Sequence, residues 1–334
     1  MNIMKKIRWG ILGTGSIATI FAKALKSMED CTLAAVASRN DIRAKEFADK
    51  FEIAKSYGDY KKLAEDPDID VVYVAVPHTE HKKMARLCMR NKKAVLCEKP
   101  FTINSRDTEE IINMAKEHKV FLMEAMWSKF LPANLRVKEW IKEGKIGKVL
   151  HIKASFGFRL EYDPTHRLYN PSLGGGALLD VGVYPISYTT FLLDKAPDKI
   201  ISSALIGASN VDEQNVIVFQ YNDSLFANLS SAIAAEIGDD ALIVGDKGII
   251  RVNKFWMANS AKLYDNNNKC IEEYKEPFKA NGYEYEAAEV NRCLREGLLE
   301  SPLNPLQDTL SNMKLMDEIR SSWGLVYPQE YEDN

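Results

Sequence analysis

Residues 7–18, IRWGILGTGSIA, decide the fold of this chain. The apolar run Ile7–Leu12 predicts a β-strand, and Ser16–Ser27 predicts the helix that follows it. The intervening GTGSIA matches the G-x-G-x-x-G/A pattern: its first glycine permits a tight turn, its second admits a pyrophosphate close to the backbone, and its alanine packs the helix on the strand. A pyrophosphate here would meet the positive end of the helix dipole. The alternative is an ordinary strand-to-helix turn. We expect dinucleotide binding at Gly13, Thr14, Gly15, Ser16 and Ile17.

Short apolar runs alternate with amphipathic segments through residue 124. The further strand-like runs are Leu33–Ser38, Asp70–Val76, Ala94–Cys97 and Val120–Met123, and the helical segments between them are Asp41–Phe51, Thr79–Asn91 and Ser105–His118. Such alternation is typical of a doubly wound parallel sheet, which belongs to the α/β class. The sequence therefore predicts an N-terminal Rossmann domain over residues 1–124.

The remaining residues, 125–334, show a different pattern, with many strands and few helices. The expected strands are Lys148–Phe158, Lys199–Ile206, Asn215–Tyr221, Leu225–Ala234, Ala241–Val244 and Gly248–Val252, and the closing helices are Tyr283–Glu300 and Leu306–Gly324. This pattern predicts an α+β domain with a largely antiparallel sheet, which would bind the substrate. Two of its strands carry more apolar side chains than one buried face requires, so we also expect a homodimer through this sheet.

The bulk composition narrows the class of partner. The 334 residues are 46% hydrophobic and 27% charged, with a net charge of −3. These values are ordinary for a globular protein and give no electrostatic footprint for nucleic acid or an anionic membrane. No apolar run approaches the roughly 18 to 20 residues that span a bilayer, so we expect a cytoplasmic protein. The five cysteines are scattered without a CxxC pair, and no metal site is expected.

The end of the second predicted strand bears on the choice between NAD and NADP. The segment Ala37–Asn40 (ASRN) lacks the Asp or Glu that usually holds the ribose hydroxyls of NAD. Ser38 can hydrogen-bond a 2′-phosphate, Arg39 can pair with it, and Arg43 adds a second cation one helical turn later. This pattern favours NADP. In the alternative interpretation, Arg39 is a solvated side chain and Asp41 is the ribose ligand.

Three more segments end at the sheet edge where ligands bind in this architecture. They are Val76-Pro77-His78, Cys97-Glu98-Lys99-Pro100 and Met123–Trp127 (MEAMW). A Glu-Lys-Pro triplet alone is usually a surface turn, but after a buried strand Lys99 becomes a functional candidate, and its bond to Pro100 can be cis. We expect cofactor contacts from Pro77, His78, His81, Glu98, Lys99 and Trp127, the last two also contacting the substrate.

The second domain carries LGGGALLDVGVYP at residues 173–185. Three consecutive glycines suggest that the backbone closely approaches a ligand or another chain. Asp180 and Tyr184 would share one face of a helix, although Pro185 is tolerated only near a helix start. The alternative is a glycine turn into a buried helix with Tyr184 in the core. The preceding segment, residues 156–170, is either a lid over the substrate or an ordinary mobile loop; its candidate contacts are Phe158, Arg159, His166 and Arg167.

GTGSIA, EKP, EAMW and LGGGALLDVGVYPI, in this order, resemble the glucose–fructose oxidoreductase/inositol dehydrogenase (Gfo/Idh/MocA) family over essentially the whole chain. Within it, the chain is similar to the branch of dimeric dihydrodiol dehydrogenase and NADP-dependent D-xylose dehydrogenase. The resemblance implies that Lys99 is the family's catalytic lysine, Asp180 its aspartate and Tyr184 its acid/base residue. Inositol dehydrogenases carry histidine in place of Tyr184, which makes an inositol substrate less expected.

The chemistry agrees with these roles. A free tyrosine has a pKa of about 10, and a nearby ammonium such as that of Lys99 would lower it, while Asp180 can orient the lysine or a substrate hydroxyl. Hydride transfer itself belongs to the nicotinamide. We therefore expect an NADP(H)-dependent oxidoreductase acting on a CH–OH or carbonyl group of a sugar or a dihydrodiol-like cyclic diol. Two alternatives are a non-catalytic NADP-binding regulatory protein and a structural partner that uses the second sheet as an interface.

Overall fold

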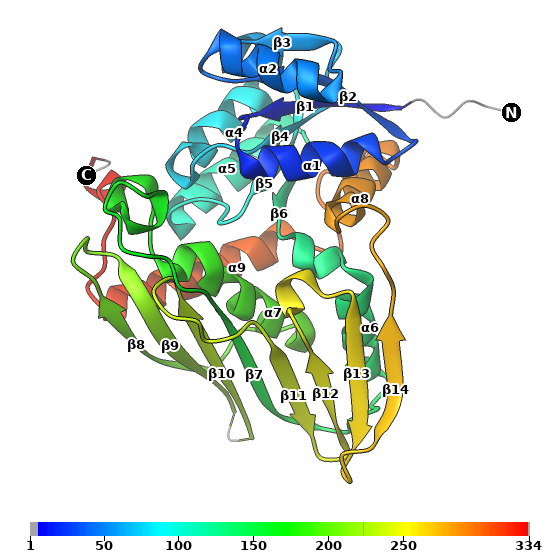
Figure 1. Ribbon diagram of the computed structural model, residues 1–334, viewed down its shortest axis with the longest axis vertical. Helices are drawn as coiled ribbons and strands as arrows, with labels where there is room; N and C mark the ends of the chain where they lie inside the picture. Colours follow the sequence, from blue (N-terminus) through cyan, green and yellow to red (C-terminus); the bar gives the residue numbers. More distant parts are fainter. Residues whose placement is uncertain (1–5, 223, 333–334) are drawn as a thin grey trace, which may run out of the picture. The chain divides into compact units, whose positions relative to one another are not determined.

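The computed structural model describes residues 6–222 and 224–332, which form two compact units (Figure 1). The first unit takes in the described residues up to Trp127 together with Phe278–Leu310, and the second takes in Ser128–Pro277 and the residues from Ser311 onward. The sequence analysis placed Phe278–Leu310 with the second domain. The residues of this segment instead belong to the first unit, to which they hydrogen-bond: the Trp9 indole N–H donates to Asn291 Oδ1 at 3.0 Å. The chain thus returns to its first unit before it ends.

The first unit contains a six-stranded sheet in the order β3-β2-β1-β4-β5-β6, with every neighbouring pair parallel. Its strands are β1 (Ile7–Leu12), β2 (Cys31–Ala37), β3 (Lys55–Tyr57), β4 (Val71–Val74), β5 (Ala94–Glu98) and β6 (Leu122–Ala125). The predicted doubly wound parallel sheet is confirmed. The strand order reverses between β1 and β4, which is the point where ligands bind in such sheets.

The helices of this unit connect successive strands. They are α1 (Ser16–Lys26), α2 (Asp41–Phe51), α3 (Tyr60–Glu65), α4 (His81–Arg90) and α5 (Ser105–His118), and α8 (Tyr283–Arg295) comes from the returning segment. Asparagine side chains cap two of them: Asn40 Oδ1 accepts the Arg43 N–H at 3.1 Å, and Asn104 Oδ1 accepts the Asp107 N–H at 2.8 Å. Such caps satisfy N–H groups that have no partner inside the helix.

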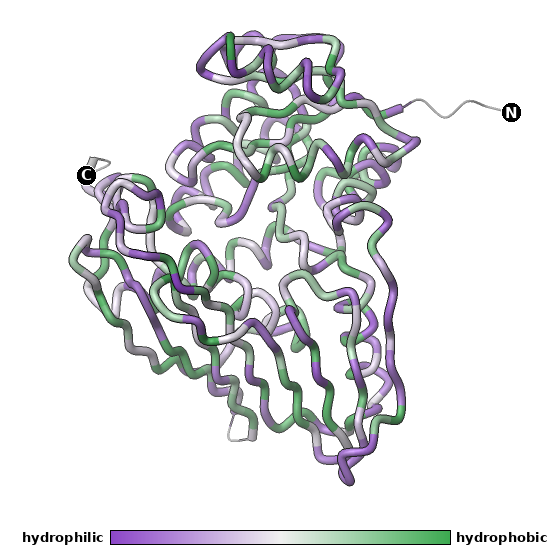
Figure 2. The backbone as a smooth tube through the Cα atoms, in the orientation of Figure 1, coloured by the Kyte–Doolittle hydropathy of each residue, from purple (hydrophilic) through white to green (hydrophobic). Residues whose placement is uncertain are grey.

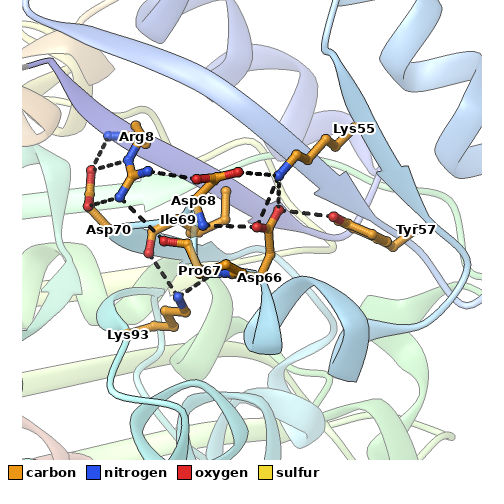
Figure 3. Close-up of polar contacts among 9 residues, drawn as sticks. All are labelled: Arg8, Lys55, Tyr57, Asp66, Pro67, Asp68, Ile69, Asp70 and Lys93. Atoms are coloured by element: carbon orange, nitrogen blue, oxygen red, sulfur yellow. Dashed lines mark hydrogen bonds and ion pairs between the residues drawn. The ribbon is translucent and has the colours of Figure 1, made fainter.

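A network of charged groups lies at the amino ends of the strands of this sheet, on the edge opposite to the one where ligands bind (Figure 3). The Arg8 guanidinium donates to both carboxylate oxygens of Asp70, at 2.8 and 3.0 Å, and the Lys55 ammonium lies 2.9 Å from Asp66 Oδ2. Burial alone would raise the pKa of Asp66, but its hydrogen bonds hold that pKa below the ordinary value. The Lys93 ammonium donates to two backbone carbonyls of the same loop. These charges face one another, so we assign this edge a structural role.

The second unit is built on an eight-stranded sheet in the order β14-β13-β12-β11-β7-β10-β9-β8. Its strands are β7 (Val149–Gly157), β8 (Lys199–Ile206), β9 (Asp212–Tyr221), β10 (Leu225–Ala232), β11 (Ala241–Gly245), β12 (Gly248–Val252), β13 (Ser260–Asp265) and β14 (Cys270–Lys275). Only the β7–β10 pair is parallel. The predicted, largely antiparallel sheet is confirmed, and β13 and β14 extend it beyond the predicted strands.

Helices cover one face of this sheet. α7 (Val183–Leu193) packs against β7 and β10, and α6 (Pro132–Lys142) packs against β13 and β14. The run Pro171–Leu193 is long and apolar enough to cross a membrane, but 89% of its most apolar window is buried inside the protein. Apolar residues all around a helix are typical of a protein core, so we identify this run as the central helix of the unit. The chain ends with α9 (Leu306–Ser322), which runs from the first unit into the second, and α10 (Gln329–Glu332).

β8, β9 and β10 are rich in hydrophobic residues (Figure 2). Some of their apolar side chains are exposed on the other face of the sheet. The strand register places Ile201, Leu205, Val216 and Phe226 on this one face, with between 42% and 64% of each residue exposed. We call these four residues the open apolar face. Contiguous apolar surface of this kind is typical of an interface between proteins.

Candidate active site

The glycine turn between β1 and α1 has the geometry that a pyrophosphate requires. Gly13 has a φ of +107°, and a Cβ atom added there would lie 2.2 Å from the carbonyl oxygen of Ala75. Gly15 is exposed, and a Cβ atom there would meet nothing within 4 Å. It precedes α1 without any side-chain cap. The first N–H groups of α1 therefore lie beside open space at the positive end of the helix, and this turn fits the diphosphate of a dinucleotide.

Two arginine side chains follow the carboxyl end of β2. Arg39 and Arg43 are exposed, while Ser38 is largely buried and its N–H donates to the Tyr57 carbonyl at 3.0 Å. The Arg39 guanidinium reaches the hydroxyl of Tyr60, a residue that the sequence analysis did not single out. Burial raises the pKa of this phenol, and Arg39 opposes the shift. These groups supply the hydroxyl and positive charge that a 2′-phosphate would need.

Asp41, the alternative ribose ligand, lies against the backbone of Gly58. A Cβ atom added to Gly58 would be only 2.0 Å from Asp41 Oδ1. Gly58 lies between β3 and α3, two elements that the sequence analysis left unassigned. Asp41 is nevertheless exposed, as Arg39 and Arg43 are, so all three charged groups are accessible near the carboxyl end of β2.

His81 ties together the loops after β4 and β5. Its ring is fully buried, with Nδ1 2.9 Å from the Pro100 carbonyl and Nε2 2.9 Å from the Val76 carbonyl. Burial lowers the pKa of this imidazole to about 4. The sequence analysis expected His81 to contact the cofactor. In the structure its ring is instead buried beneath the two loops and holds them together through these hydrogen bonds. These loops carry Pro77, His78 and Lys99, and the Lys99–Pro100 bond is cis.

A buried acidic pair lies beneath the Lys99 loop. Glu98 accepts hydrogen bonds from the Tyr73 hydroxyl and, at 3.1 Å, from the Lys99 N–H, and burial raises its pKa to about 7. Glu286 on α8 is fully buried, and neither of its carboxylate oxygens has a hydrogen-bond partner in the described part of the chain. Burial and, secondarily, the charge of Glu98 raise the pKa of Glu286 well above its ordinary value. This environment therefore favours the neutral form of the Glu286 carboxyl.

Trp127, expected to contact both cofactor and substrate, is 2% exposed and stacks on Tyr283 with ring centroids 4.2 Å apart. Tyr283 begins α8, and Glu284 holds the turn before it by accepting three backbone N–H groups at 2.7 to 3.1 Å. The Asn281 amide in this turn donates to the Ile20 carbonyl of α1 at 2.8 Å. The returning segment thus braces both the Trp127 ring and the helix that follows the glycine turn.

In the second unit, Asp180 and Tyr184 lie on one continuous helical run. Leu178–Gly182 forms a π turn, and α7 begins at Val183. Pro185 lacks an N–H group, and its ring would clash with the carbonyl four residues earlier in a regular helix; a wider π turn at that point is a known accommodation. The structure thus resolves the open question about Pro185: the segment is helical through the proline.

Aromatic rings surround the Tyr184 side chain. Phe156 stacks on Trp256 with ring centroids 4.6 Å apart, and the Tyr184 ring meets both edge-on, at 5.5 and 6.1 Å. Phe158 adds a further edge contact to Phe156 at 6.5 Å. The Trp256 indole N–H donates to Asp239 at 3.2 Å. The sequence analysis missed Trp256, since it lies in a turn 72 positions after Tyr184 without a recognisable motif.

Arg167 pairs with Asp180 at 2.9 Å, so the structure brings two of the predicted substrate residues together. The Asp180 side chain is 7% exposed, whereas that of Arg167 is 52% exposed. The other candidates of this loop do not join the pair. Arg159 is exposed and its backbone bridges to Ala234, and His166 Nδ1 accepts the Leu168 N–H at 3.2 Å.

Within residues 6–222 and 224–332, no group of three or more His, Cys, Asp or Glu side chains is placed to hold a metal ion. The polar groups described above are a phenol, carboxylates and cations. The first unit offers a phosphate-binding turn and cations, and the second offers Asp180, Arg167 and Tyr184 beside an aromatic surface. This set suits acid–base chemistry on a hydroxyl or carbonyl group.

Comparisons with known proteins agree in both units. A model of an oxidoreductase family with an NAD-binding Rossmann fold matches residues 7–126, and the GFO/IDH/MocA C-terminal domain matches residues 134–251. The chain is 35% identical to trans-1,2-dihydrobenzene-1,2-diol dehydrogenase of Mus musculus (97% of this chain and 99% of the relative covered) and 37% identical to that of Xenopus laevis (96% and 99%). A structure of a 3-ketoreductase from Actinomadura kijaniata with NADP and TDP-benzene matches with a TM-score of 0.85 at 25% identity, covering 95% of this chain and 98% of that one.

The buried acid Glu286 should make stability depend on pH. Its folded-state pKa is raised, so stability is fully present below the unfolded pKa and is lost as pH rises toward the folded pKa. In Glu286→Gln this loss is absent. We expect its unfolding free energy, relative to the wild type, to increase by up to about 1.4 kcal/mol per pH unit above about pH 5. Urea denaturation at a series of pH values measures this difference.

Glu117→Gln is the control, because Glu117 is an exposed residue on α5. Its unfolding free energy should follow that of the wild type at every pH. Parallel curves for Glu286→Gln and the wild type would show that the Glu286 carboxyl has the same pKa in the folded and unfolded states, contrary to this prediction.

Proposed function

The chain belongs to the Gfo/Idh/MocA family of NAD(P)-binding oxidoreductases, and on this premise we propose that it is an NADP(H)-dependent enzyme. It transfers a hydride between the nicotinamide and a CH–OH or carbonyl group of a sugar or a dihydrodiol-like cyclic diol. The observation that carries this proposal is the placement of Asp180 and Tyr184 on one helical run beside stacked aromatic rings. A phenol, a carboxylate and an apolar ring surface are what a cyclic diol requires.

The aromatic surface supports a ring-shaped substrate. The Trp256 ring, which is partly exposed and stacks on the buried Phe156 ring, offers an apolar surface for one face of a substrate ring. The Asp180–Arg167 pair supplies an acceptor and donors for hydroxyl groups. The relatives named above act on a benzene dihydrodiol or are 3-ketoreductases, and both names are consistent with a ring bearing hydroxyl or keto groups.

NADP fits the first unit through two groups of residues. Gly13 to Ile17 would hold the pyrophosphate, and Ser38, Arg39 and Arg43 would hold the 2′-phosphate. When bound, the nicotinamide supplies the hydride donor or acceptor. NADP is the dinucleotide in the 3-ketoreductase structure, which supports this choice over NAD.

Tyr184 is the proposed acid/base residue. It takes the proton from a substrate hydroxyl during oxidation and returns a proton during reduction. Because an ordinary phenol has a pKa of about 10, a positive charge is needed to make it an effective base near neutrality. We assign this role to the Lys99 ammonium, and Asp180 orients the lysine or the substrate hydroxyl.

The direct test is a substrate screen with purified protein, in which pentoses, hexoses and trans-cyclic dihydrodiols are each supplied with NADP and formation of NADPH is followed by absorbance. Turnover of a sugar or cyclic diol supports the proposal. Tight NADP binding without turnover of any such compound would instead favour the non-catalytic regulatory protein.

Cofactor preference depends on Arg39. We expect NADP to bind at least about tenfold more tightly than NAD, and Arg39→Ala to remove most of that difference, since a charge-assisted hydrogen bond is worth about 1.5–3 kcal/mol. Calorimetric titration with both dinucleotides measures it. Arg90→Ala, at the exposed end of α4, is the control and should keep the preference. Equal affinities for both dinucleotides in the wild type would exclude this role of Ser38 and Arg39.

Tyr184→Phe should lower kcat by about two to four orders of magnitude, the usual contribution of general acid–base catalysis, with NADP affinity unchanged. Steady-state kinetics and cofactor titration measure both. The control is Tyr188→Phe, one turn later on the same helix. The Tyr188 hydroxyl is buried without a hydrogen-bond partner in the described chain, so its removal should leave turnover nearly normal.

Lys99→Met should impair the same step, because it removes the charge that acidifies the phenol. If the two residues act as a unit, Tyr184→Phe combined with Lys99→Met loses little more activity than the worse single variant. Near-normal turnover of Tyr184→Phe would assign the proton transfer to another group, with His166 as the next candidate.

We further propose that the enzyme is a homodimer through the open apolar face. Light scattering at micromolar concentration should give at least a dimeric mass, and Val216→Lys should lower it, because it places a charge within the apolar contact. Ile42→Lys is the control: Ile42 is 68% exposed in the first unit and should not affect assembly. A monomeric mass for the wild type would contradict this proposal.

A further inference from the structure

Asp212, the first residue of β9, is a fully buried carboxylate that the proposed mechanism does not use. Its Oδ2 accepts the Leu178 N–H at 2.7 Å and the Asn215 amide N–H at 2.8 Å. Its Oδ1 has no hydrogen-bond partner among the described residues. Burial of an ionisable group is costly unless its partners offset the cost. Here the partners are the N–H at the start of the helical run and a side-chain amide.

The same network contacts the helical run a second time. Asn215 Oδ1 accepts the Ser231 hydroxyl at 2.9 Å. Ser231 on β10 lies against Gly182, since a Cβ atom there would be 2.8 Å from Ser231 Oγ. The chain of hydrogen bonds from Asp212 through Asn215 to Ser231 therefore touches the run at Leu178 and at Gly182. These two positions stand on either side of Asp180.

Asp212 also contacts the glycine loop before this run. Gly176 has a φ of +110°, and a Cβ atom there would lie 2.3 Å from Asp212 Oδ1. The Gly176 N–H donates to the Leu168 carbonyl at 2.8 Å, and the Tyr327 hydroxyl donates to the Gly175 carbonyl at 2.7 Å. The loop thus packs on the 3₁₀ turn that carries Arg167, the partner of Asp180.

We infer that Asp212 is a positioning residue: its buried carboxylate fixes the backbone that presents Asp180 and Tyr184 and, through the glycine loop, the turn that presents Arg167. The inference rests on the proposed function for the roles of these three residues. An anionic carboxylate at a helix start makes a charge-assisted hydrogen bond and interacts favourably with the helix dipole. It therefore holds the first turn of the run in place, and Asp180 lies in that turn.

Burial raises the pKa of Asp212 to about 7 even though two N–H donors meet one of its oxygens, so the anionic carboxylate predominates above neutral pH. The Tyr327 phenol is the titratable group that its charge affects, and the Arg320 guanidinium lies over the Tyr327 ring at 5.6 Å. Asp212→Asn keeps the size of the side chain but removes the charge, and it places an NH₂ group against Gly176 or Leu178. In the second orientation the hydrogen bond from the Leu178 N–H is lost, and in the first it remains but is no longer charge-assisted; each change weakens the start of the run.

The experiment compares Asp212→Asn with the wild type and with Leu263→Ala. Leu263 is a buried residue of β13 in the same sheet, so its truncation lowers stability away from the helical run. Hydrogen exchange is measured on a peptide covering residues 174–187, and kcat and the KM for NADP are measured with any substrate that the wild type accepts.

We expect Asp212→Asn to speed exchange in this peptide by about tenfold, as for loss of one charged hydrogen bond. Its kcat should fall by roughly ten- to a hundredfold through misplacement of the reacting groups, with the KM for NADP unchanged. Leu263→Ala should lower the melting temperature but leave exchange in this peptide and kcat near the wild-type values.

Unchanged exchange in Asp212→Asn would overturn the inference, as would faster exchange with an unchanged kcat. A fall in kcat of the same size in Leu263→Ala would also overturn it, because general destabilisation would then suffice. If the wild type turns over none of the substrates, the proposed function fails, and the exchange arm still decides whether Asp212 holds the helical run.

Discussion

The carbonyl of Ala75 approaches Gly13 so closely that no side chain fits between them, and the architecture of the first unit depends on this contact. It lies where β1 and β4 run parallel, at the reversal of strand order. The turn then directs α1 so that its amino end begins at Gly15. The second unit contains a comparable contact, between Gly176 and the Asp212 carboxylate, immediately before its central helical run. In both units a glycine accepts a close approach, and a helix starts in the same turn or directly after it.

The two helix starts differ in how their N–H groups are satisfied. This difference distinguishes a helix start that can bind a ligand from one that positions side chains. α1 begins without a side-chain cap beside open space, so an external anion can complete it. The run of the second unit begins on Asp212, so the protein itself supplies the anion. In the proposed function, the same physical device receives a ligand in one unit and holds the catalytic side chains in the other. A helix start that is already satisfied can be rigid before any ligand arrives.

The sequence predicted the features that depend on neighbouring residues and missed those that depend on residues far apart in the chain. The bounds of β1, α2 and α5 match the prediction, because each follows a clear hydrophobic period with a turn or cap at its end. β3 and α3 were left unassigned because they are too short to show a period, and the return of Phe278–Leu310 to the first unit leaves no mark in its own residues. Trp256, Glu286 and Asp212 were missed for the same reason, since their importance lies in partners far away in sequence. The predicted family is confirmed, because its motifs are local and occur in a fixed order.

Tyr184 and Tyr188 show why the proposed chemistry needs more than a buried tyrosine. They lie one turn apart on the same helix, and burial alone raises the pKa of the Tyr188 phenol far above its ordinary value. A phenol so shifted is a poor acid and cannot exchange protons near neutrality. Tyr184 has different surroundings from Tyr188, since its ring meets the Phe156 and Trp256 rings. The proposal assigns the acidifying charge to Lys99, because a phenol with the ordinary pKa of about 10 needs a positive charge nearby to act as a base near neutrality.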